Sequence, residues 1–157
     1  MKLSGPQLRH KAAAGGVELG LDSEVAVRAA FDRLASPEVL VERMAPPGLE
    51  LLVAARRDGV IPTLVVAPGG AFAEARDAAV VLALPASAAR VERALESLPG
   101  AAALARLAAR TGDLLLEHGF ELIELNPVIA TRTAAIAVDA LACRQATAPT
   151  RELEPAT

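Results

Sequence analysis

The stretch FELIELNPVIATRTAAIAVDA, residues 120–140, contains two apolar runs that predict two adjacent β-strands. Asn126 interrupts the first run and is followed at once by Pro127, and Asp139 closes the second run. The sequence therefore predicts an amide and a carboxylate at the ends of neighbouring strands. Two hard oxygen donors suit Mg²⁺, which fills the rest of its shell with water and phosphate oxygens. The alternative is that Asn126 is a turn residue before proline and that Asp139 is a solvated strand-end acid.

The remaining chain predicts strands, then helices, then the two closing strands, which is an α+β arrangement with a mainly antiparallel sheet. Strands are expected at residues 17–21, 39–44, 49–57, 60–67 and 78–85. Helices are expected at residues 24–35, 87–98 and 101–119. Asp58-Gly59 favours a hairpin between two of these strands, and Gly119 suits a helix C-cap. No G-x-G-x-x-G motif follows a strand, which argues against a Rossmann fold.

Composition excludes several classes of partner. Aromatic residues make up 2% of the 157 residues, with no Trp or Tyr, so a platform for stacking bases is not expected. The net charge of -3 is also unsuited to a large phosphate-backbone footprint, and no nucleic-acid partner is expected. No run approaches the roughly 20 apolar residues that span a membrane, and no signal peptide is evident. With Cys143 as the single cysteine there is no disulfide framework, and a cytoplasmic location is expected.

Two glutamates, Glu42 and Glu50, flank the proline turn APPG at residues 45–48. If the flanking segments are adjacent strands, both carboxylates could face one cleft. The alternative is that they are exposed strand glutamates without a shared role.

Two glycine pairs, Gly15-Gly16 and Gly69-Gly70, permit a close approach of the backbone to a ligand. Backbone amides in such turns can hold phosphate, although each pair can also be only a turn. The cations Lys2, Arg9, His10 and Lys11 precede the first pair, and a surface basic cluster is the alternative interpretation.

Four segments together resemble a known family. HKAAAGGVELGL (10–21), VLVERMAPPGLELLVAARRD (39–58), PGGAFAEARDAAV (68–80) and ELNPV…AVDA (124–140) occur in the order seen in the ATP-grasp part of NDP-forming acyl-CoA synthetases. These are the ADP-forming acetate–CoA ligases, related to the succinyl-CoA synthetase β subunit. The resemblance covers Lys2 to about Ala142. It implies an α+β ATP-grasp fold, with an incomplete flap lobe at 1–37, a nucleotide- and Mg²⁺-binding lobe at 38–143 and a disordered tail at 144–157.

The resemblance also implies roles for single residues. Asn126 and Asp139 match the family's Mg²⁺ ligands. Glu42 matches the hinge position near adenine and ribose, and Glu50 matches an acid that faces the nucleotide. Lys2 is similar to the lysine that reaches the nucleotide phosphates. Gly15 and Gly16 are similar to the tip of the glycine-rich flap, and Lys11 is grouped with these nucleotide-binding residues.

Two further residues match positions involved in phosphoryl relay. His10 falls on a histidine that relays a phosphoryl group in ADP-forming enzymes, and Glu124 on an acid near the phosphohistidine of the partner domain. The implied reaction passes a phosphoryl group from that phosphohistidine to Mg²⁺-bound ADP, with ATP or ADP and Mg²⁺ as cofactors. The expected partner is a CoA-binding domain or subunit in a hetero- or homo-oligomer. The sequence leaves open the acyl group and ADP against GDP.

The sequence departs from the family's pattern in three places. The family has more chain before the lysine, a longer loop between the helices that here run LESLPGAAALARLAAR, and polar residues where HKAAAGGV has alanines. Losing polar groups near a phosphate removes hydrogen bonds of about 1.5–3 kcal/mol each. The rival hypothesis is therefore a catalytically degenerate ATP-grasp-like module with a structural or regulatory role beside a CoA-binding protein. The third hypothesis is that the motifs occur by chance in an unrelated α+β domain.

Overall fold

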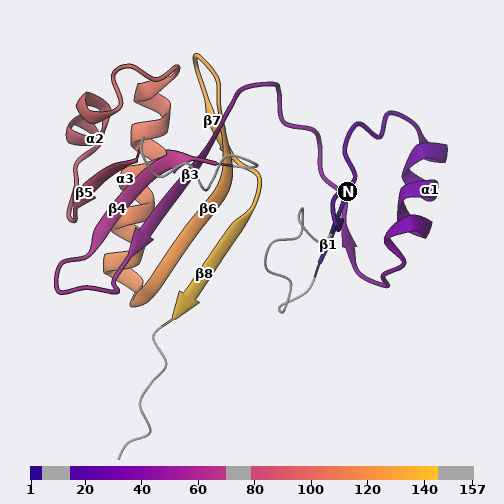
Figure 1. Ribbon diagram of the computed structural model, residues 1–157, viewed down its shortest axis with the longest axis horizontal. Coiled ribbons are helices and arrows are strands. Elements are labelled where there is room, and N and C mark those ends of the chain that lie inside the picture. Colours follow the sequence, from indigo (N-terminus) through magenta and orange to yellow (C-terminus); the bar gives the residue numbers. More distant parts are fainter. Residues whose placement is uncertain (5–14, 70–78, 145–157) are drawn as a thin grey trace, which may run out of the picture. The chain divides into compact units, whose positions relative to one another are not determined.

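The computed structural model describes residues 1–4, 15–69 and 79–144 (Figure 1). The chain divides into two compact units, Met1–Ala45 and Pro46–Thr157, and each is described by itself. The sequence analysis placed residues 38–45 with the second lobe. The structure groups them with the first unit because the strand at Val39–Leu40 pairs with the strand at Lys2–Leu3.

The second unit is a six-stranded antiparallel sheet with two helices. Its elements are β3 (Leu49–Arg56), β4 (Thr63–Pro68), β5 (Val80–Ala83), α2 (Ala88–Ala94), α3 (Ala101–His118), β6 (Phe120–Ala130), β7 (Ala135–Ala137) and β8 (Ala140–Arg144). The strand order is β5-β4-β3-β6-β7, and β8 also pairs with β6. The long strand β6 therefore bonds to β3 along one side and to β7 and β8 along the other.

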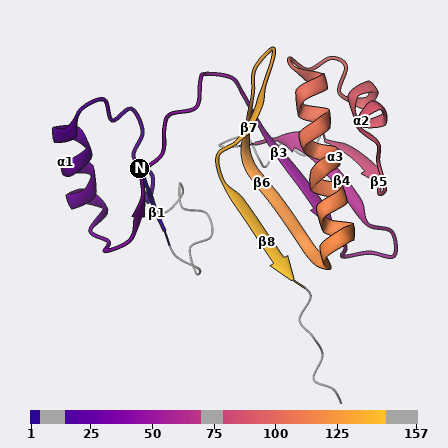
Figure 2. The ribbon, with the colours of Figure 1, turned by 180° about the vertical axis from the view of Figure 1, so that it is seen from behind.

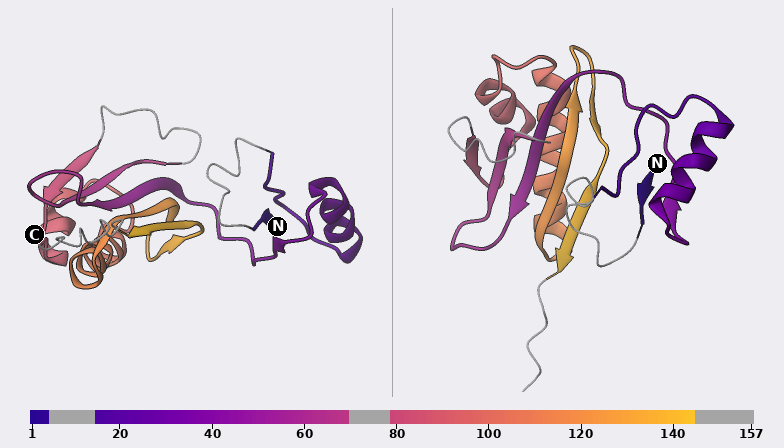
Figure 3. Two further views of the ribbon diagram at one scale, coloured as in Figure 1. Left: turned by 90° about the horizontal axis from the view of Figure 1, so that it is seen from below. Right: turned by 45° about the vertical axis from the view of Figure 1, so that its right-hand side comes forward.

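The helices cover one face of this sheet (Figures 2 and 3). Alternate residues of β3, Leu51, Val53 and Ala55, are buried on that face. Buried residues of α3, including Leu104, Ala108 and Leu115, fill the same core. Several of the α3 core residues are alanines, which let the helix backbone approach the sheet closely. The opposite face of the sheet is left without a helix among the described residues.

The sequence-based elements of this unit are largely confirmed. β3 and β4 pair in the expected antiparallel way, but residues 57–62 connect them in place of a tight Asp58-Gly59 turn, so β4 begins at Thr63. Gly119 follows α3 in the left-handed conformation, with φ of 66°, as expected for a C-cap. The last expected strand, at residues 134–140, is observed as the shorter β7, and β8 was not expected from the sequence. None of the helices in the described ranges combines the length and apolar character that a membrane crossing requires.

The first unit contains β1 (Lys2–Leu3), α1 (Glu24–Leu34) and β2 (Val39–Leu40). Ser23 caps α1 by accepting a hydrogen bond from the amide of Ala26. The strand expected at 39–44 is only two residues long, and the one expected at 17–21 is a single bridge from Val17 to Lys2. Both predictions were too long because short apolar segments were read without knowing their pairing partners.

The first unit buries little apolar surface. Ala30 is its one fully buried hydrophobic residue among those described, while Val25 and Val41 are 77% and 59% exposed. Hydrogen bonds and ion pairs therefore contribute a larger fraction of the stabilising interactions in this unit than in the second unit.

A glycine fixes the turn between α2 and α3 against the β6–β7 hairpin. Gly100 has φ of 69°, and a Cβ at this position would overlap the carbonyl oxygen of Thr131. We expect Gly100→Ala to lower the free energy of unfolding by more than about 2 kcal/mol, from left-handed strain together with the clash. Urea denaturation measures this change.

The matched control is Gly119→Ala. Gly119 has φ of 66° but no atom within 4 Å of the added Cβ, so only the backbone strain of about 1–2 kcal/mol applies. Equal losses in both variants would contradict a tight contact between Gly100 and Thr131.

Candidate functional site

The structure brings Asn126 and Asp139 together. β6 pairs with β7 through Val128 and Ala137 and with β8 through Leu125 and Ala140, in one continuous register. In that register Asn126 lies directly opposite Asp139, and its backbone amide donates a hydrogen bond to the Asp139 carbonyl, 3.2 Å away. Directly opposed residues of antiparallel strands have neighbouring side chains on one face. The predicted pairing of an amide with a carboxylate on adjacent strands is therefore present.

The position of Asn126 along its strand differs from the prediction. Asn126 lies inside β6, which continues to Ala130, and not at its end. Asp139 lies in the short break between β7 and β8. Proline lacks an amide donor, and β6 accommodates Pro127 at a bulge in its pairing with β3.

The bulge determines which face of the sheet Asn126 occupies. Between the pairs Leu51–Val128 and Val53–Leu125, β3 has one residue, Leu52, and β6 has two, Asn126 and Pro127. Leu125 and Val128 on either side both pack in the helix-covered core. β6 therefore has one extra residue at this point, and Asn126 and Pro127 lie outside that core, on the open face. Bulges often aim side chains in this way next to functional sites, and the sequence analysis did not foresee this one.

Two other predicted residues share the open face. Glu124 alternates with Ile123 and Leu125, which belong to or pack on the core, so its side chain lies on the other side of the sheet and is half-buried. Glu50 precedes the buried Leu51, pairs with Ile129 and is exposed. The open face of the second unit therefore presents three carboxylates and one amide from β3, β6 and the β7–β8 break.

The first unit gathers a second set of predicted residues. Lys2 pairs in β1 with Leu40 and bridges to Val17, beside Gly16, whose carbonyl accepts a hydrogen bond from the Leu3 amide at 2.9 Å. The Lys2 ammonium lies 2.9 Å from a carboxylate oxygen of Glu42.

Other predicted members of the nucleotide-binding set are placed differently or not at all. Gly15 is exposed with φ of 69°, a conformation that favours glycine. His10 and Lys11 lie outside the described residues.

Glu42 and Glu50 do not lie on adjacent strands, which was one of the two interpretations of their spacing. Glu42 follows the two-residue strand β2 and is in no strand itself, whereas Glu50 is in β3, whose neighbours are β4 and β6. The two residues also fall in different units. The proline turn between them links the units and is not a hairpin turn.

Gly69 lies in close backbone contact with β3. Its amide donates to the carbonyl of Glu50 at 3.0 Å, and an added Cβ would overlap backbone atoms of Leu51. The contact is with the neighbouring strand of the sheet. The following Gly70 lies outside the described residues.

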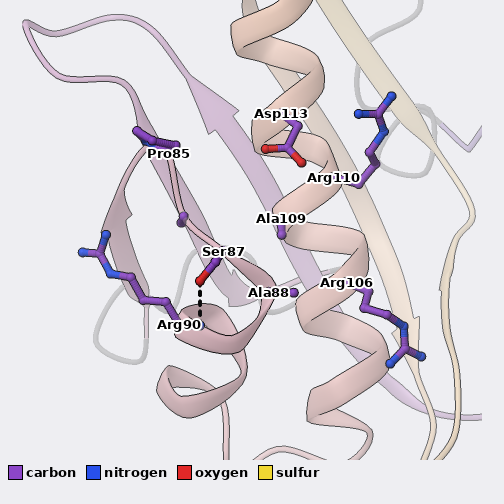
Figure 4. A pocket seen from close by; sticks show the side chains of 9 residues that line it. Pro85, Ser87, Ala88, Arg90, Arg106, Ala109, Arg110 and Asp113 are labelled. Carbon is purple, nitrogen blue, oxygen red and sulfur yellow. Dashed lines mark hydrogen bonds between the residues drawn. The ribbon is translucent and has the colours of Figure 1, made fainter.

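A cavity on the helix-covered side was not expected from the sequence. It has a volume of about 590 Å³ and lies between the start of α2 and α3 (Figure 4). Arg90 points to one side and Arg106 and Arg110 to the other, while Arg110 pairs with Glu117 at 3.2 Å. The arginines do not converge, and none of the predicted site residues lines this cavity. The cavity is therefore not the predicted site.

An ion pair connects the segment after Gly16 to α1. Arg33 donates hydrogen bonds from Nε and Nη2 to the two carboxylate oxygens of Glu18, at 2.9 and 3.0 Å. These hydrogen bonds are the main reason why the pKa of the Glu18 carboxyl lies below its ordinary value, with desolvation opposing them. The same pair raises the pKa of Arg33.

We expect the Glu18–Arg33 pair to make the first unit sensitive to acid. Because the folded pKa of Glu18 is lowered, its contribution is complete above the ordinary glutamate pKa and is lost as the pH falls through the lower folded value. Arg33→Gln removes the guanidinium, so the pKa of Glu18 should rise toward its ordinary value. An NMR titration of the Glu18 side-chain carboxyl carbon measures it.

Arg28→Gln is the control, because Arg28 pairs with Glu24 on the same helix and not with Glu18. A Glu18 titration midpoint that is unchanged by Arg33→Gln would contradict the assignment.

The open face fits a magnesium ion by the chemistry of its donors. Asn126 and Asp139 supply an amide and a carboxylate oxygen from neighbouring, half-buried positions. No cluster of three or more His, Cys, Asp or Glu suited to a metal occurs in the described parts of the chain. A site with two protein ligands is consistent with that, since Mg²⁺ commonly keeps waters and takes further oxygens from phosphates.

Comparison with known proteins places the chain in a family. Residues 1–115 match the family model described as "ATP-grasp domain". The chain is 31% identical to the β subunit of an ADP-forming acetate–CoA ligase from Pyrococcus furiosus, over 89% of this chain and 72% of that protein. The chain therefore belongs to the ATP-grasp family and is homologous to this β subunit. Chance motifs in an unrelated domain are thereby excluded.

Two further relatives give the same result. A trans-feruloyl-CoA synthase from an unknown prokaryotic organism is 33% identical over 82% of this chain, which matches 22% of that longer protein. An acetyl-coenzyme A synthetase structure from Candidatus Korarchaeum cryptofilum has a TM-score of 0.79 at 28% identity, covering 92% of this chain and 75% of that one. That structure contains coenzyme A and Mg-AMPPCP, with its phosphohistidine segment pointing towards the nucleotide-binding site. The predicted α+β ATP-grasp fold is confirmed.

Proposed function

We propose that this chain is the nucleotide-binding part of an NDP-forming acyl-CoA synthetase. In this proposal it holds Mg²⁺-bound ADP, to which a phosphoryl group is transferred from a phosphohistidine on a CoA-binding partner domain or subunit. The observation that supports the proposal most is the opposed pair Asn126 and Asp139 on the open face of the sheet. The Korarchaeum relative, which holds a magnesium nucleotide and a phosphohistidine segment, supports the same reaction class.

The residues of the second unit would position the phosphates. Asn126 and Asp139 would hold Mg²⁺ through their side-chain oxygens, and the ion would supply positive charge against the phosphate oxygens. Both residues are set by the register of β6, so binding does not first have to order a loop. Glu50 and Glu124 would stand toward the nucleotide and the partner's phosphohistidine respectively. Phosphoryl transfer depends mainly on such positioning and charge neutralisation.

The residues of the first unit would contact the phosphates as well. The Lys2 ammonium would neutralise phosphate charge, and the backbone beside Gly15 and Gly16 would approach the nucleotide. Glu42 would lie near adenine and ribose. His10 and Lys11 stay predictions as the relay histidine and a nucleotide-binding cation.

We expect Asp139→Asn to weaken Mg²⁺-dependent binding of ADP by about tenfold or more, because it removes a charged ligand whose interactions are worth about 1.5–3 kcal/mol. Asn126→Ala should have an effect in the same direction. Isothermal titration calorimetry of the full chain with ADP, with and without Mg²⁺, measures both, and circular dichroism verifies folding.

Asp113→Asn is the matched control, since it makes the same change on α3, on the helix-covered side. It should bind Mg-ADP as the parent does. Wild-type affinity in Asp139→Asn, or affinity that does not depend on Mg²⁺ in the parent, would refute the magnesium site.

The second candidate function is a degenerate ATP-grasp-like module that associates with a CoA-binding protein without catalysis. The observation that favours it is the sparse core of the first unit, where Ala30 is the one fully buried hydrophobic residue of the described part. Absence of any ADP or ATP binding in the calorimetric titration would support this function over the first.

A further inference from the structure

Lys2 is held in place more firmly than lysines usually are. Its backbone pairs with Leu40 of β2 on one side and bridges to Val17 on the other. Its side chain is only 12% exposed. The backbone pairing and the low exposure together keep the ammonium near the position where the structure places it.

Glu42 is the more exposed partner of this ion pair. Its carboxylate lies 2.9 Å from the Lys2 ammonium, yet the side chain is 48% exposed. Glu42 follows β2 and makes no strand pairing of its own. A half-exposed carboxylate on an unpaired segment loses little when it leaves, because ion pairs with a solvated partner contribute little to stability.

The Lys2 ammonium is a cation that can bind an anion, and the Glu42 carboxylate occupies that position in this structure. A carboxylate carries one negative charge, whereas a nucleotide polyphosphate carries several, with oxygens that also accept hydrogen bonds. A polyphosphate would therefore compete well for the Lys2 ammonium.

We propose that Glu42 occupies the anion position at Lys2 in the free protein and is displaced from it by the polyphosphate of the nucleotide. The inference rests on the proposed function for the identity of the anion. Glu42 then opposes phosphate binding, and the released carboxylate becomes able to accept hydrogen bonds from the rest of the ligand.

The test uses inorganic tripolyphosphate, so that binding of the polyphosphate is measured without the nucleotide base. We expect Glu42→Gln to bind inorganic tripolyphosphate about three- to tenfold more tightly than the parent at low ionic strength, because it removes the competing charge. Lys2→Met should lose this binding, and the double variant should show no gain from Glu42→Gln. Isothermal titration calorimetry of the full chain measures all three.

Glu38→Gln is the matched control for net charge. Glu38 is an exposed glutamate of the same unit, and no ion pair with Lys2 is found for it among the described residues. Tripolyphosphate affinity that is equal in Glu42→Gln and Glu38→Gln, or weaker in Glu42→Gln than in the parent, would overturn the exchange.

Comparison with Mg-ADP distinguishes the two proposals. If Mg-ADP binding depends on Asp139 but Glu42→Gln gives no gain with tripolyphosphate, the exchange is refuted and the nucleotide site stands. If Glu42→Gln binds tripolyphosphate more tightly in a way that requires Lys2, but Mg-ADP binding is unchanged in Asp139→Asn, the displacement of Glu42 is supported and the proposed function is refuted.

Discussion

The register of β6 is the constraint on which the second unit depends. This strand bonds to β3 on one side and to β7 and β8 on the other, so its alignment fixes the faces of four strands at once. A slip of one residue would exchange buried and open faces. The bulge opposite Leu52 changes the alternation once, at Asn126 and Pro127. Core residues resume on the correct face after it, and the polar pair stays on the other.

The two faces of the sheet thereby have separate tasks. The helix-covered face provides stability, through the apolar cluster that joins β3, β4 and β6 to α2 and α3. Glycines such as Gly100 and Gly112 allow the close approach of turns and side chains there. The open face holds the oxygen-bearing residues. A substitution on the open face is therefore expected to disturb the core little, so the proposed metal binding can be tested there separately from stability.

The first unit is organised differently. With few buried apolar side chains, it depends on short backbone pairings and on the ion pairs Lys2–Glu42 and Glu18–Arg33. Ion pairs with exposed partners are weak and exchange readily with solvent or ligands. The same weakness that limits the stability of this unit would let its charged groups change partners when a polyphosphate binds.

The sequence by itself determined the α+β class, the helices α1 and α3, the hairpin of β3 and β4, and the family resemblance, because these depend on local periodicity, turn residues and motif order. It also predicted that Asn126 and Asp139 belong together. Only the tertiary structure decided that β6 has a bulge at Asn126, that Glu42 pairs with Lys2 and that Glu42 and Glu50 lie in different units. Strand pairing and bulges join residues far apart in the chain, so their outcome depends on partners that local patterns do not contain.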